Sequence, residues 1–132
     1  MSMNPVVHFE MPSDDSKRMS EFYIKVFGWQ TTQMGPEMNN YITVATTDID
    51  PSTNRPKTAG AINGGFFPRS AENSEITVVI SVDDINKSIE LVKQAGGAII
   101  SGPHDIPHVG LYVAFKDTEG NRVAMLQPSP TM

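Results

Sequence analysis

The chain has 132 residues, no cysteine and a formal net charge of -5. This length suits one compact domain with a real core, and the lack of cysteine excludes disulfide bonds and thiolate metal ligands. The acidic balance disfavours nucleic acids and anionic lipids as partners, because binding these requires clustered Lys and Arg. We therefore expect a small organic ligand. No basic segment followed by an apolar run opens the chain, so we expect neither export nor membrane insertion, and a cytoplasmic location.

The first part of the chain predicts a strand, a helix and three further strands. An apolar run from Val6 ends at Pro12 and Ser13, and Asp14 or Asp15 is expected to cap a helix. Apolar residues then recur at helical spacing up to Gly28, a glycine that can adopt the left-handed backbone conformation that ends a helix. The buried stripe of that helix consists of Met19, Phe22, Tyr23, Val26 and Phe27. Strands are predicted over 29–33, 41–46 and 59–67.

The second part repeats this pattern after a polar linker at 70–74. Residues 6–28 align without a gap on 75–97, which places Asp15 on Asp84 and Gly28 on Gly97. A strand over 76–82, a helix up to Gly96 and Gly97, and strands over 98–101, 111–116 and 122–127 are predicted. The turn at 117–121 needs a residue with positive φ, either Gly120 or Asn121.

The repeat predicts one α+β domain over 1–132, made of two βαβββ modules, 5–69 and 75–128. Each copy supplies half of a buried surface that is marginal alone. We expect curved, mostly antiparallel sheets around a cleft, and we expect the functional site in the cleft between the modules.

Four segments carry a family resemblance: VVHFEMPSDDSKRMSEFYIKVFGW, GAINGGFF, VDDINKSIELVKQAGG and KDTEGNRVAMLQP. They resemble the vicinal oxygen chelate superfamily, and more narrowly its uncharacterised glyoxalase-like bacterial branch. The superfamily includes glyoxalase I, extradiol dioxygenases, epimerases, fosfomycin-modifying enzymes and bleomycin resistance proteins, so the resemblance implies the fold and leaves the chemistry open. It also implies a homodimer.

The resemblance implies four metal-ligand positions, one on the first and one on the last strand of each module. His8 occupies the first of them. Thr77 and Ala124 occupy the two positions of module two, and Ile62, Asn63 or Gly64 the remaining one. A catalytic zinc usually needs three His, Asp, Glu or Cys ligands, so a divalent metal is disfavoured and no cofactor is expected.

Strand alternation places His8 and Glu10 on the face opposite Phe9 and Met11, which should meet the helix. Three interpretations stay open for His8 and Glu10: acid and base catalysis, contact with a polar ligand group, or a structural pair. Ligand contact is also expected for Asn63, Thr77, Tyr112 and Ala124. Trp29, Tyr41 and Phe67 line either a pocket or the core.

Two other motifs favour structural interpretations. Gly64 and Gly65 allow close backbone approach, of a ligand or more simply of a neighbouring strand. His104 and His108 lie in a segment, 102–110, that contains two prolines and is expected to be an irregular loop at the rim of the cleft rather than a metal site.

The expected function is metal-independent binding of a small molecule, as in the resistance proteins. The alternative is a lyase or isomerase of the lactoylglutathione lyase type, and a third possibility is regulation through a degenerate cleft. Whether the protein is an enzyme stays open at this point.

Overall fold

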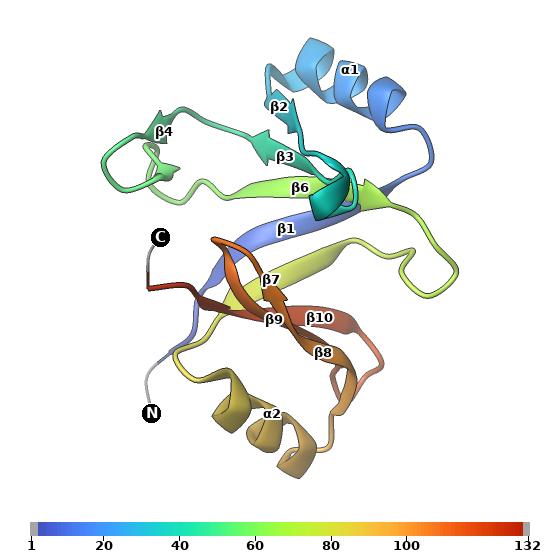
Figure 1. Ribbon diagram of the computed structural model, residues 1–132, viewed down its shortest axis with the longest axis vertical. Helices are drawn as coiled ribbons and strands as arrows, with labels where there is room; N and C mark the ends of the chain where they lie inside the picture. The colour runs from blue at the N-terminus through green and yellow to red at the C-terminus, as the bar shows by residue number, and fades with distance from the viewer. Residues whose placement is uncertain (1–2, 131–132) are drawn as a thin grey trace. The chain divides into compact units, whose positions relative to one another are not determined.

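The computed structural model describes residues 3–130, which fall into two compact units (Figure 1). The module-one unit is His8–Ile76. The module-two unit joins the residues up to Val7 with those from Thr77 onward, so it is discontinuous in sequence. Each unit contains one α-helix and a mixed sheet, which confirms the predicted α+β fold class.

The module-one unit is built from one helix and a sheet with the strand order β2-β3-β6-β1. Strand β1 is parallel to β6, and the other neighbours are antiparallel. Its elements are β1 (Val6–Ser13), α1 (Ser16–Phe27), β2 (Gln30–Gln33), the short η1 helix (Pro36–Met38), β3 (Ile42–Ala45) and β6 (Asn63–Pro68). A small separate hairpin, β4 (Ile49–Asp50) and β5 (Arg55–Pro56), lies between β3 and β6 along the chain, where no strand was predicted. Strand β1 also runs through Pro12, where the sequence predicted its end.

Helix α1 begins and ends where the sequence chemistry requires it. Asp15 has extended backbone, and its Oδ1 accepts a hydrogen bond of 3.0 Å from the Arg18 amide. Gly28 ends the helix with φ of 71°, the left-handed conformation that costs glycine nothing. Asp14 is not the cap, because its carboxylate pairs with Arg69 at 3.1 Å.

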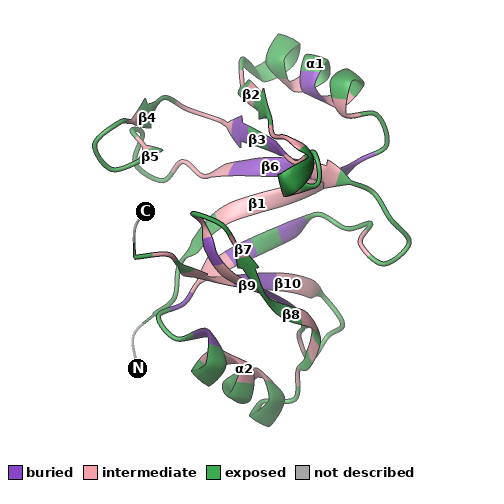
Figure 2. Ribbon diagram, in the orientation of Figure 1, coloured by how far each residue is buried: buried purple, intermediate pink, exposed green. Residues whose placement is uncertain are grey.

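The core of the module-one unit lies between α1 and one face of its sheet. Ile42, Val44 and Phe66 are buried there, as Figure 2 shows for β3 and β6. Tyr23 of α1 stacks on Trp29 with ring centroids 4.7 Å apart. Phe9 and Met11 pack against this core, which leaves the alternate residues of β1, including His8 and Glu10, on the other face.

The module-two unit repeats the same topology. Its elements are β7 (Thr77–Ser81), α2 (Ile85–Gln94), β8 (Ala98–Ile106), β9 (Gly110–Lys116) and β10 (Arg122–Pro128), with strand order β7-β10-β9-β8 and β7 parallel to β10. The aligned aspartate, Asp84, caps α2 by accepting from the amides of Asn86 and Lys87. The N-terminal residues belong to this unit, because the Ser81 amide donates to the Pro5 carbonyl at 2.9 Å.

The core of the module-two unit likewise lies under its helix. Val82, Ile85, Val113 and Met125 are buried together. The hairpin between β9 and β10 confirms the turn prediction, since Gly120 has φ of 83°. Among residues 3–130, no helix is both long and apolar enough to cross a membrane.

The prediction of an irregular loop over 102–110 is wrong for most of its length. Strand β8 continues to Ile106 and pairs with β9, and two register shifts absorb the irregular sequence around Gly102 and Pro103. His104 lies opposite Tyr112 within this pairing, and His108 stands in the following turn with φ of 65°.

Candidate functional site

Three polar side chains of the module-one unit form a hydrogen-bonded chain on the sheet face that α1 leaves uncovered. The Tyr41 hydroxyl lies 3.0 Å from His8 Nε2 and donates to Glu10 Oε2 at 3.2 Å. His8 and Glu10 are two residues apart on β1, so they share a face, and Tyr41 immediately precedes β3. Tyr41 therefore connects the start of β3 with β1, across the intervening strand β6.

Gly65 makes this reach possible. It lies directly opposite Glu10 in the pairing of β1 with β6, and opposite Thr43 in the pairing of β6 with β3. A Cβ atom at Gly65 would collide with the ring and hydroxyl of Tyr41. The predicted close approach at this glycine is thus made by a side chain of the protein itself.

Burial keeps the imidazole of His8 neutral. Loss of solvent lowers the pKa of His8 from 6.5 to about 4, because burial disfavours the charged ring. A phenol has one proton, and Tyr41 donates it to the Glu10 carboxylate. His8 Nε2 must then be the donor to the Tyr41 oxygen, so the neutral tautomer carries its proton on Nε2 and leaves Nδ1 as an acceptor.

This electrostatic state limits the chemistry of His8. A general base works best when its pKa lies near the working pH, and a pKa of about 4 makes a weak base at neutral pH. The same neutral imidazole, held in one tautomer by its neighbour, is well suited to hydrogen bonding with an uncharged polar group. The arrangement therefore favours binding over proton abstraction.

Asn63 lies beside this chain but is engaged in the sheet. It pairs with His8 in the register of β1 with β6. Its Oδ1 accepts from the Thr46 amide at 2.8 Å and from the Thr46 hydroxyl at 3.3 Å. These bonds fix the chain leaving β3, and a ligand contact of Asn63 stays a prediction.

The other three predicted positions belong to the module-two unit. Thr77 and Ala124 are only 1% and 0% exposed. Tyr112 is half-buried on β9, opposite Leu126. The structure thus gathers His8, Glu10 and Asn63 in one unit and places Thr77, Tyr112 and Ala124 in the other. Their contact with a ligand, and a cleft between the modules, stay predictions.

The donor set around His8 does not fit a divalent metal. Within residues 3–130, no three His, Asp or Glu side chains gather closely enough to hold an ion. His8 Nε2 is also committed to the Tyr41 hydroxyl. A catalytic metal site needs about three protein ligands, and His8 supplies at most one of them.

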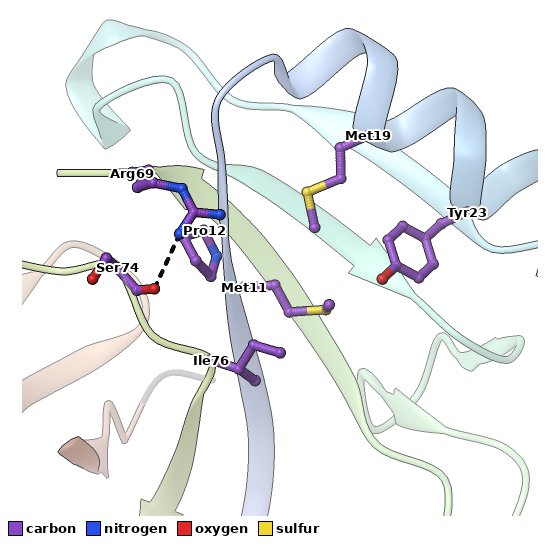
Figure 3. Close-up of a pocket in the computed structure, with 7 residues that line it drawn as sticks. All are labelled: Met11, Pro12, Met19, Tyr23, Arg69, Ser74 and Ile76. Atoms are coloured by element: carbon purple, nitrogen blue, oxygen red, sulfur yellow. Dashed lines mark hydrogen bonds between the residues drawn. The ribbon is translucent and has the colours of Figure 1, made fainter. Parts of the chain in front are cut away.

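A hollow of the module-one unit lies elsewhere. It has a volume of about 480 Å³ and is lined by Met11 and Pro12 of β1, Met19 and Tyr23 of α1, and Arg69, Ser74 and Ile76 after β6 (Figure 3). A second hollow of about 110 Å³ lies near Ser13 and Phe67. Met11 points to the helix side of β1, so the larger hollow is separate from the face of His8 and Glu10.

Sequence reasoning missed the role of Tyr41. It treated this residue as a pocket or core aromatic, whereas its hydroxyl connects the two predicted site residues. The available signal was Gly65, because a glycine within a strand marks a place where another group approaches closely.

Comparisons with known proteins agree with this fold. A sequence profile of the glyoxalase/bleomycin resistance protein/dioxygenase superfamily matches residues 6–125. A glyoxylase-like domain-containing protein of Didymella fabae is 30% identical over 125 residues, which cover 88% of each chain. A probable lactoylglutathione lyase of Vibrio cholerae is 23% identical and covers 96% of this chain and 93% of its own. Among solved structures, a Streptomyces coelicolor methylmalonyl-CoA epimerase in complex with 2-nitronate-propionyl-CoA superposes with a TM-score of 0.69 at 13% identity, covering 97% of this chain and 99% of that one.

Proposed function

The chain belongs to the glyoxalase/bleomycin resistance protein/dioxygenase superfamily, and from this premise we propose that it binds a small organic molecule without a divalent metal. The proposed contact surface is the sheet face that carries His8, Tyr41 and Glu10. The single observation that supports it most is the hydrogen-bonded chain through the Tyr41 hydroxyl.

The chain of bonds supports a binding role because it fixes three polar groups before any ligand arrives. Such preorganisation lowers the entropic cost of binding. His8 is neutral at physiological pH, since burial lowers its pKa to about 4. Nδ1 of this imidazole is a hydrogen-bond acceptor, so the ligand group that binds it is a donor such as a hydroxyl or an amide.

A lyase or isomerase is the second candidate. The name of the Vibrio cholerae relative supports it, because that protein is a probable lactoylglutathione lyase and matches nearly the whole chain. Two observations count against it. No three His, Asp or Glu side chains gather among residues 3–130, and His8 is a weak base. We also propose that the protein is a homodimer and that it is located in the cytoplasm. Light scattering of the purified protein tests the homodimer.

Elemental analysis of protein purified without chelator tests the metal-independent part. The expected result is less than one transition metal ion per chain, and no rise in melting temperature on adding nickel, zinc or iron. Stoichiometric metal would overturn this part of the proposal. An assay for S-lactoylglutathione formation from methylglyoxal and glutathione, with and without added metal, tests the lyase candidate directly.

A thermal-shift screen of uncharged small metabolites tests the binding surface. Compounds that stabilise the wild type should lose their effect in His8→Gln and Tyr41→Phe. His104→Gln is the matched control, because His104 is exposed on β8. Equal stabilisation of all four proteins would exclude the His8 face as the binding surface.

A further inference from the structure

Two cationic side chains stand directly opposite each other in the module-two unit. Lys116, the last residue of β9, pairs with Arg122, the first residue of β10. Residues in such a pair have Cβ atoms about 5 Å apart and point to the same face, and like charges placed this way destabilise a sheet. The chain has 10 basic and 15 acidic residues, so two adjacent cations are unexpected in this acidic sequence.

Nearby carboxylates do not neutralise this pair. Asp117 is committed to the hairpin turn, where its oxygens accept from the amides of Glu119 and Asn121 and from the Asn121 side chain. Glu119 accepts from the Thr118 hydroxyl. No ion pair of Lys116 or Arg122 exists among the described residues 3–130.

Arg122 also has an unsatisfied donor. Its Nε atom is buried and has no hydrogen-bond partner within the part of the chain that the structure describes. A buried donor without an acceptor is costly and uncommon in native proteins. The Arg122 guanidinium thus has neither an ion pair nor a partner for Nε among the described residues.

Lys116 and Arg122 lie on the face of the sheet opposite α2. Phe115 packs into the core beneath α2, so its neighbour Lys116 points to the opposite face of the sheet. Arg122 shares that face with Ala124, which lies opposite Ala114 in the next pair of the same register. Lys116 is exposed and Arg122 is half-buried, so the pair is accessible from one side.

We propose that Lys116 and Arg122 form a binding site for an oxyanion, the carboxylate or phosphate group of a small metabolite. The planar guanidinium of Arg122 matches either group with two parallel hydrogen bonds, and Lys116 contributes a second positive charge. The bound anion removes the repulsion between the two cations. This proposal stands independently of ligand binding at His8.

Titration calorimetry with inorganic phosphate and with acetate, each against chloride at equal ionic strength, tests the site. Lys116→Gln and Arg122→Gln should each weaken binding about tenfold, the loss expected for one charge-assisted hydrogen bond. Lys87→Gln is the matched control, because Lys87 is exposed on α2 and its replacement changes the net charge equally. A stronger response to phosphate or to acetate identifies which of the two groups the site prefers.

Melting temperatures give a readout that is independent of ligand affinity. Without oxyanion, Lys116→Gln should melt at a higher temperature than the wild type, because one of two repelling charges is gone. With phosphate or acetate, the wild type should gain stability and the variant should not. Lys116 is exposed, so this variant keeps the test valid if Arg122→Gln folds poorly.

Two results would overturn the proposal. One is the absence of phosphate and acetate binding by the wild type at millimolar concentration, and the other is equal binding by the wild type and Lys116→Gln. His8→Gln should bind both anions as the wild type does. A failure at Lys116 and Arg122 is therefore distinguishable from a failure of the binding surface at His8.

Discussion

The hydroxyl of Tyr41 occupies the space that a side chain at Gly65 would need. Tyr41 crosses β6 at this glycine to reach Glu10 and His8 on β1. Gly65 thus has a role that depends on the absence of a Cβ atom. The contact between Gly65 and Tyr41 should therefore be sensitive to a single added methyl group.

Gly65→Ala should lower the free energy of unfolding by about 1–3 kcal/mol, the usual cost of overpacking. Denaturant unfolding measures it. In a Tyr41→Ala background the same substitution should cost much less, because the colliding ring is gone. Gly35→Ala is the control, since the nearest atoms to a Cβ atom at Gly35 belong to the flexible carboxylate of Glu37. Equal costs with and without Tyr41 would contradict this account.

Tyr41→Phe should destabilise the protein by about 1–2 kcal/mol, because it removes an acceptor from His8 and a donor from Glu10. Nitrogen NMR of the imidazole should show the Nε2-protonated tautomer in the wild type and a mixture of tautomers in the variant. Tyr23→Phe serves as the comparison, because it removes a hydroxyl from a ring that stacks on Trp29, away from His8. An unchanged tautomer in Tyr41→Phe would show that another group sets it.

Stability should depend on the protonation of His8 at mildly acidic pH. Burial lowers the pKa of folded His8 from 6.5 to about 4. Between these pH values the unfolded chain therefore binds a proton at His8, whereas the folded protein does not. The free energy of unfolding should therefore fall as pH decreases from 6.5 to 4, by at most about 3 kcal/mol from this group, and this contribution should level off below pH 4.

Unfolding curves at a series of pH values measure that dependence. His8→Gln should lose this part of the slope, whereas His104→Gln should keep it, because His104 is exposed. A slope that is the same in the wild type and His8→Gln would assign the acid sensitivity to other residues.

The two aspartates before α2 should differ sharply in their contributions. Asp84 accepts from two amides at the start of α2, so Asp84→Ala should cost about 1 kcal/mol of stability. Asp83→Ala should change stability little, because Asp83 is exposed and is not the cap residue. Thermal unfolding of both variants checks this, and a larger loss in Asp83→Ala would show that the helix start is misassigned.

Local signals made most of the fold predictable. Helix α1 follows from a capping aspartate, helical spacing of apolar residues and Gly28, all of which act within a few residues. The choice between Asp14 and Asp15 did not follow, because it depends on Arg69, which lies far along the chain and pairs with Asp14. Strand β8 was underestimated for a similar reason, since its continuation depends on pairing with β9 through register shifts.

The candidate site was only half predictable. Alternation along β1 places His8 and Glu10 on one face, and the family resemblance pointed to His8. The third member, Tyr41, comes from a different strand region and reaches them only because β3, β6 and β1 pair in a particular register. No periodicity within one segment contains that information.

The module-two unit is discontinuous in sequence, and this determines how each unit can be obtained by itself. Ser81 donates to Pro5, so a residue that precedes the module-one unit in the chain forms part of a unit whose other strands follow it. A single protease cut within 70–74 leaves the fragment before the cut with residues of both units, and neither unit is released as one continuous piece. Fragment complementation after such a cut, rather than expression of two separate halves, is the way to obtain each unit intact.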